Sequence, residues 1–90
     1  MMKLRNEDIR KITEIKQYLL DPPVSFKLYD YALDYLQNAI QILAAYPDAN
    51  DTNTYLKNLL EQLNNKAIEQ TELRNTLKQA GIEISRLTNK

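Results

Sequence analysis

Ninety residues suffice for one domain, and the 43% share of hydrophobic residues predicts a packed core within a single domain spanning 1–90. The chain has no histidine, no cysteine and one glycine, which excludes the usual general base, thiolate chemistry, cysteine-based metal sites and glycine-rich phosphate loops. Twelve basic and twelve acidic side chains balance to zero, without the dense basic face that nucleic acids require.

These exclusions indicate a protein that is not an enzyme and that needs no cofactor or metal. We also expect no binding to nucleic acid. The first residues, Met1 to Arg5, lead directly into charged side chains, so no signal-peptide core is predicted. Because no apolar run approaches the roughly 20 residues that span a bilayer, we expect no membrane insertion and a cytoplasmic location.

The first predicted helix covers residues 6–20. Asn6 is the expected N-cap, and carboxylates follow it in the first turn, where they favour the helix dipole. Apolar residues recur at helical spacing on one side of this segment: Ile9, Ile12, Ile15, Leu19 and Leu20. The helix should stop at Asp21, because the following Pro22 and Pro23 cannot continue it.

The second predicted helix begins near Ser25 or Phe26 and ends at Tyr46, before Pro47. Its main apolar stripe consists of Tyr29, Ala32, Leu33, Leu36, Ile40 and Leu43. A second apolar group lies beside that stripe and widens the arc to roughly 200°, against about 100° for an ordinary surface helix. This helix is therefore either central and packed on two sides, or it offers apolar surface to a partner.

The second apolar group is the candidate interaction surface, which consists of Leu28, Tyr31, Tyr35, Ile42 and Tyr46. Six tyrosines against one phenylalanine and no tryptophan is the least ordinary feature of the composition. Tyrosine suits interfaces because it offers a large rigid ring with a polar tip. Packing of the same residues at the edge of a small core is the competing interpretation.

The polar segment 47–53 predicts a connection, and a third helix should begin near Thr52. Mostly apolar residues then recur at heptad spacing from Leu56 to Leu87 without a change of phase, which favours one long helix. Lys66 and Gln70 nevertheless occupy two middle heptad positions, either as a polar specificity layer or at a turn. Poor helix formers precede them, so a turn near 64–71 with Thr71 as the next N-cap is the preferred prediction.

The predicted fold is therefore all-α, a small antiparallel bundle of four helices, with three helices including a long C-terminal one as the alternative. Two acidic patterns in the sequence bear on metal binding. The segment 48–52 opens like a calcium loop but lacks the required glycine and glutamate, so helix capping explains it. Asp30 and Asp34 lie one helical turn apart and are expected to be hydrated on the polar face.

Two resemblances bear on function. Residues 4–23 resemble the helix that leads into an AraC-type DNA-binding domain, which implies a transcriptional regulator or an accessory to one. The next segment of such a domain is a helix-turn-helix, whereas residues 26–46 predict one uninterrupted helix without glycine. In size, helix order and lack of catalytic residues, the chain is also similar to the class IIa bacteriocin immunity proteins, which are small cytoplasmic four-helix bundles.

The favoured functional hypothesis is a non-catalytic helical protein that acts by protein–protein contact, as an adaptor, inhibitor, immunity-type or assembly protein. The wide apolar arc of the second helix would supply the contact, and a homodimer is the first partner to consider. The regulator hypothesis is the alternative.

Overall fold

The chain forms four α-helices and one short 3₁₀ helix, with no strand in the residues that the structure describes. The structure is a computed structural model that describes residues 4–65 and 68–88. In chain order the elements are α1 (Asn6–Leu20), α2 (Leu28–Leu43), η1 (Pro47–Ala49), α3 (Asn50–Asn65) and α4 (Gln70–Thr88). The predicted all-α fold with four helices is confirmed.

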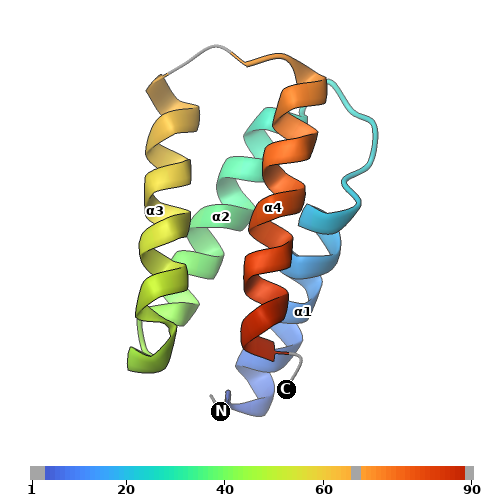
Figure 1. The fold of residues 1–90 in the computed structure, drawn as a ribbon. Coiled ribbons are helices and arrows are strands. Elements are labelled where there is room, and N and C mark those ends of the chain that lie inside the picture. Colours follow the sequence, from blue (N-terminus) through green and yellow to red (C-terminus); the bar gives the residue numbers. More distant parts are fainter. Residues whose placement is uncertain (1–3, 66–67, 89–90) are drawn as a thin grey trace.

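The helices alternate in direction along the chain, so that sequence neighbours run antiparallel (Figure 1). The most extensive packing joins α1 to α4, and the next joins α2 to α3. Helix α2 also packs on α1 and on α4, so it is in contact with all three other helices. The radius of gyration of 12.5 Å matches the value of about 12 Å expected for a compact chain of this length.

The central position of α2 accounts for much of its wide apolar arc. A helix with three neighbours buries more of its circumference than a surface helix does. The fully buried stripe of α2 consists of Leu28, Ala32, Leu36, Ala39 and Leu43. Only part of the predicted 200° arc therefore remains available to a partner.

Helix α1 has the predicted bounds, but its predicted cap is wrong. Arg5 is the N-cap, with extended backbone and no side-chain capping bond, and Asn6 is the first helical residue. Of the predicted apolar stripe, Ile12, Ile15 and Leu19 are buried, whereas Ile9 in the first turn is 44% exposed. The helix ends at Leu20 because the paired prolines after Asp21 have no backbone N–H to continue it.

Helix α2 is shorter at both ends than predicted. At its start, the backbone N–H of Leu28 donates to the Ser25 carbonyl in a turn, so the α-helix begins at Leu28. At its end, Ala45 and Tyr46 donate to the carbonyls of residues three positions earlier, as in a 3₁₀ turn. This tightening comes before Pro47, which disfavours α-helical backbone in the residue it follows.

The predicted turn between the last two helices is confirmed, and the single long helix is excluded. Helix α3 ends at Asn65 and α4 begins at Gln70, so Thr71 is inside α4 rather than at its N-cap. The coiled-coil role considered for Gln70 is also wrong, since its exposed side chain donates through Nε2 to the Ser25 carbonyl at 2.8 Å. Lys66 lies outside the described residues.

One hydrophobic cluster forms the core, and every α-helix contributes to it. The third helix starts slightly earlier than predicted, at Asn50, directly after η1. In the described part of the chain, none of the helices combines the length and the apolarity that crossing a membrane demands.

Candidate functional site

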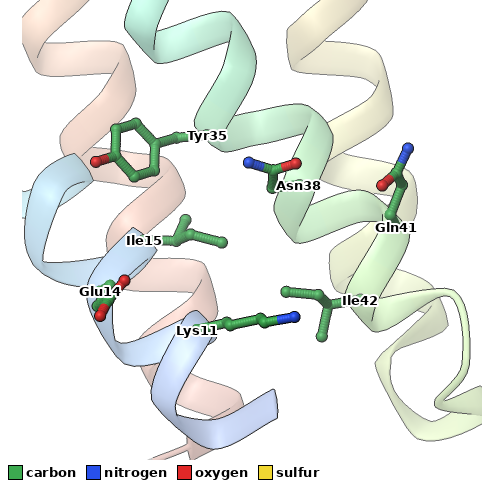
Figure 2. A pocket seen from close by; sticks show the side chains of 7 residues that line it. All are labelled: Lys11, Glu14, Ile15, Tyr35, Asn38, Gln41 and Ile42. Carbon is green, nitrogen blue, oxygen red and sulfur yellow. The ribbon is translucent and has the colours of Figure 1, made fainter. Parts of the chain in front are cut away.

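A groove lies between α1 and α2, and we call it the α1/α2 groove. It encloses about 280 Å³ and is lined by Lys11, Glu14 and Ile15 of α1 and by Tyr35, Asn38, Gln41 and Ile42 of α2. Figure 2 shows Ile15 and Ile42 pointing toward each other across it, while the Lys11 side chain extends from α1 toward α2. Apolar side chains thus form the inner surface, and polar side chains form the rim.

Helical spacing brings these residues onto facing sides of the two helices. On α2, Tyr31, Tyr35, Asn38 and Ile42 follow one another at intervals of three or four residues. Such residues line one face of a helix. On α1 the same spacing joins Lys11, Glu14 or Ile15, and Tyr18. The groove therefore lies along the flank of α2 that the sequence predicts as the candidate interaction surface.

An aromatic pair joins α1 to α2 beside the groove. The rings of Tyr18 and Tyr35 stack with centroids 4.1 Å apart and an interplanar angle of 20°. The Tyr18 hydroxyl is buried and has no hydrogen-bond partner among the described residues. Burial raises the pKa of Tyr18, since the charged phenolate would lose its hydration there. The pair holds Tyr35 in place as one wall of the groove.

The five predicted surface residues divide into three groups in the structure. Tyr35 and Ile42 line the groove, and Tyr31 is 47% exposed beside it. Leu28 is a correction: it is only 1% exposed, because the first turn of α2 points it into the core. Tyr46 follows α2 and is half-buried, with its hydroxyl engaged within the molecule.

Tyr46 belongs to a polar cluster that ties the end of the α2 segment to the start of α1. Its hydroxyl donates to Oδ2 of Asp8 and accepts from the Arg5 backbone N–H at 3.1 Å. The Arg5 guanidinium lies 3.3 Å from the same carboxylate. The Tyr46 hydrogen bond, with help from the Arg5 charge, lowers the pKa of Asp8 against the opposing effect of desolvation. This cluster is structural, since its groups satisfy one another.

Sequence reasoning missed the most exposed apolar residues of the described chain. Val24 and Phe26 are 86% and 91% exposed in the connection between α1 and α2. The sequence pattern predicts Phe26 at the start of a helix and gives no role to Val24. Two large apolar residues at alternating positions after Pro22 and Pro23 were the available signal, because the prolines exclude a helix that would bury them.

The two acidic patterns of the sequence lie on α2 and across η1 and the start of α3. Asp30 and Asp34 are both exposed on α2. The described residues hold no group of three or more acidic, histidine or cysteine side chains placed to bind a metal ion. In the segment that resembled a calcium loop, Thr52 lies buried within α3, which begins at Asn50, so Thr52 is inside the helix rather than at its cap.

Comparison with protein-family models finds no match, and comparisons with curated proteins and with solved structures find no significant match.

Proposed function

We propose that this chain is a non-catalytic protein-binding module that contacts its partner through the α1/α2 face, meaning the α1/α2 groove together with Tyr31. The observation that carries the proposal is the groove itself. Its inner surface is apolar, through Ile15, Ile42 and the Tyr35 ring, and it stays open to solvent. A protein interface has the same arrangement, with an apolar centre that excludes water and a polar rim.

The rim supports recognition of a protein rather than of a small apolar molecule. Lys11, Glu14, Asn38 and Gln41 offer one cation, one anion and two amides around the apolar centre. Such groups form hydrogen bonds with backbone and side chains of a partner and so fix its orientation. Tyr31 adds a half-exposed ring with a free edge to contact the partner. A second copy of the chain is the first partner to consider.

The test is site-specific photocrosslinking in the native host. A benzophenone amino acid replaces Gln41 at the groove rim. A matched variant carries it at Gln79, an exposed glutamine on α4 outside the groove. We expect discrete protein adducts from position 41 and none of the same species from position 79. Adding Asn38→Lys should suppress the adducts, because a bulky charge then blocks the groove. Equal adducts from both positions, or none from position 41, would contradict the proposal.

A further inference from the structure

The connection between α1 and α2 presents two apolar side chains on an anchored loop, which we call the 21–27 loop. Helix α4 holds its backbone: Nη1 of Arg74 donates to the Pro22 carbonyl at 2.7 Å, and Gln70 donates to the Ser25 carbonyl. Within the loop, the Lys27 backbone N–H donates to Oγ of Ser25 at 3.1 Å. These bonds fix the backbone while the side chains of Val24 and Phe26 stay in solvent.

An exposed aromatic ring on a backbone that is already fixed is suited to binding. Ordering a loop on binding costs conformational entropy, and hydrogen bonds that hold the loop beforehand remove that cost. At 91% exposed, Phe26 contributes almost nothing to the core of its own molecule. Its full apolar surface is therefore available to be buried against another chain.

The molecule itself contains a site of suitable size for that ring. The α1/α2 groove encloses about 280 Å³. A cavity of about 150 Å³ with apolar walls is enough to hold benzene. The hollow between α3 and α4, at about 60 Å³, is too small for the same purpose. A wider hollow of about 670 Å³ on α3 is lined by polar and charged side chains (Asn58, Glu61, Gln62 and Asn65), which do not suit an apolar ring. The Phe26 ring cannot reach its own groove by a small rotation, since the groove lies further along the helices.

The spacing between loop and groove permits a reciprocal exchange. The groove residues of α2, 35 to 42, lie seven to fourteen positions beyond Leu28, or about 10–20 Å along the helix at 1.5 Å per residue. The 21–27 loop stands at the start of α2, at one end of the same helix pair (Figure 1). In a dimer with its two-fold axis near Tyr31, the loop of each copy lies at the same level along the helices as the groove of the other copy.

Charge favours the same pairing. Lys27 is next to Phe26, and Glu14 is on the groove rim. The other charged group of the rim, Lys11, lies 3.9 Å from Glu7 of its own helix. An incoming Lys27 would meet Glu14, the acidic group of the groove rim. Opposite charges at the rim of an interface steer and orient association.

We propose that two copies of this chain associate about a two-fold axis, with Phe26 of each copy seated in the α1/α2 groove of the other. The inference rests on the proposed function and adds the partner and the residue that enters the groove. Seating each Phe26 ring in the groove of the other copy buries both the ring and the groove of each molecule in one self-complementary interface. Tyr31 would contact its counterpart near the axis.

Sedimentation velocity and light scattering over a range of concentrations test association. We expect a species of about 21 kDa, twice the 10.5 kDa of one chain. Phe26→Ser should raise the dissociation constant at least about thirtyfold, as the loss of a hot-spot ring does. It should leave the helical circular dichroism unchanged because the ring is outside the core. Tyr55→Ser, at a partly exposed ring on α3, is the matched control and should leave the dimer intact.

Disulfide pairing tests the geometry, and the chain has no cysteine of its own to interfere. Single variants Lys27→Cys and Asn38→Cys are mixed and oxidised. Random pairing of equal amounts gives the mixed disulfide about half of the dimers, so we expect the 27–38 disulfide to rise well above that share at the expense of both symmetric ones. A dimer that pairs 27 with 27, or one that Phe26→Ser does not weaken, overturns the inference. A monomer at every concentration also overturns it, whereas the photocrosslinking at position 41 decides separately whether the face binds another protein.

Discussion

The packing of α1 on α4 depends on the single glycine of the chain. Gly81 lies buried in α4, where a Cβ atom would come within 2.8 Å of Leu20 Cγ and 3.2 Å of the Leu20 backbone nitrogen. Carbon atoms in ordinary contact are about 3.5–4.0 Å apart. Glycine at this position therefore permits an approach of the two helices that any other residue would obstruct.

Gly81→Ala brings two opposing effects on the free energy of unfolding. Alanine is favoured over glycine inside a helix by about 1 kcal/mol, which is stabilising. Overpacking against Leu20 costs about 1–3 kcal/mol, and the nearby backbone nitrogen limits how far the helices can adjust. We expect the cost to exceed the gain, for a net destabilisation of about 1 kcal/mol.

The sign should reverse when the obstructing side chain is removed. In a Leu20→Ala background the Cγ and Cδ2 atoms are absent, so Gly81→Ala should stabilise the protein by up to about 1 kcal/mol. Urea unfolding of the four proteins, followed by circular dichroism, gives the coupling between the two positions. Gln79→Ala and Gln79→Gly, at an exposed position of α4, supply the alanine–glycine difference without packing. If Gly81→Ala stabilises the parent chain by that same difference, the close approach is refuted.

Three further predictions concern the core and the tyrosines. Tyr18→Phe should leave the free energy of unfolding unchanged or raise it by up to about 1 kcal/mol. The substitution removes a buried hydroxyl without a described partner and keeps the ring stacked on Tyr35. A loss above about 1 kcal/mol in urea unfolding would contradict this. Tyr46→Phe should destabilise at neutral pH and have less effect in acid. The lowered pKa of Asp8 contributes stability that is complete above the unfolded pKa of about 3.9 and is lost as pH falls through the folded pKa. If the difference in free energy of unfolding between Tyr46→Phe and the parent stays constant down to about pH 2, this prediction is refuted. Leu36→Ala should cost about 2–5 kcal/mol because the side chain is 0% exposed, and a loss below about 1 kcal/mol would place it outside a tight core.

The helix pattern could be predicted because it depends on local signals. The bounds of α1 follow from its apolar spacing and from the two prolines after Asp21. The turn after α3 follows from the weak helix formers Asn64 and Asn65, which outweighed an uninterrupted heptad pattern. The predicted ends of α2 are wrong because the flanking residues form short turns there. Such turns differ from the α-helix only in which carbonyl accepts each backbone N–H.

The candidate surface could be predicted only in part, because helical periodicity gives a face but not its neighbours. Tyr35 and Ile42 lie at the groove as the spacing indicated, whereas Leu28 turned out to face the core. The difference depends on how α2 is rotated against three other helices, which no local pattern encodes. The bond from Arg74 to the Pro22 carbonyl joins residues 52 apart in sequence, so this anchoring of the 21–27 loop on α4 was equally out of reach.

The pairing of α1 with α4 has a consequence for how the molecule opens. Terminal helices commonly fray independently, yet here each one packs most extensively on the other, although they are the most distant elements in sequence. Bringing them together closes a long loop, so their contact should form after the local α2–α3 hairpin. Amide hydrogen exchange should then show α1 and α4 opening as one cooperative unit, with α2 and α3 exchanging more slowly; distinct protection in α1 and α4 would argue against this coupling.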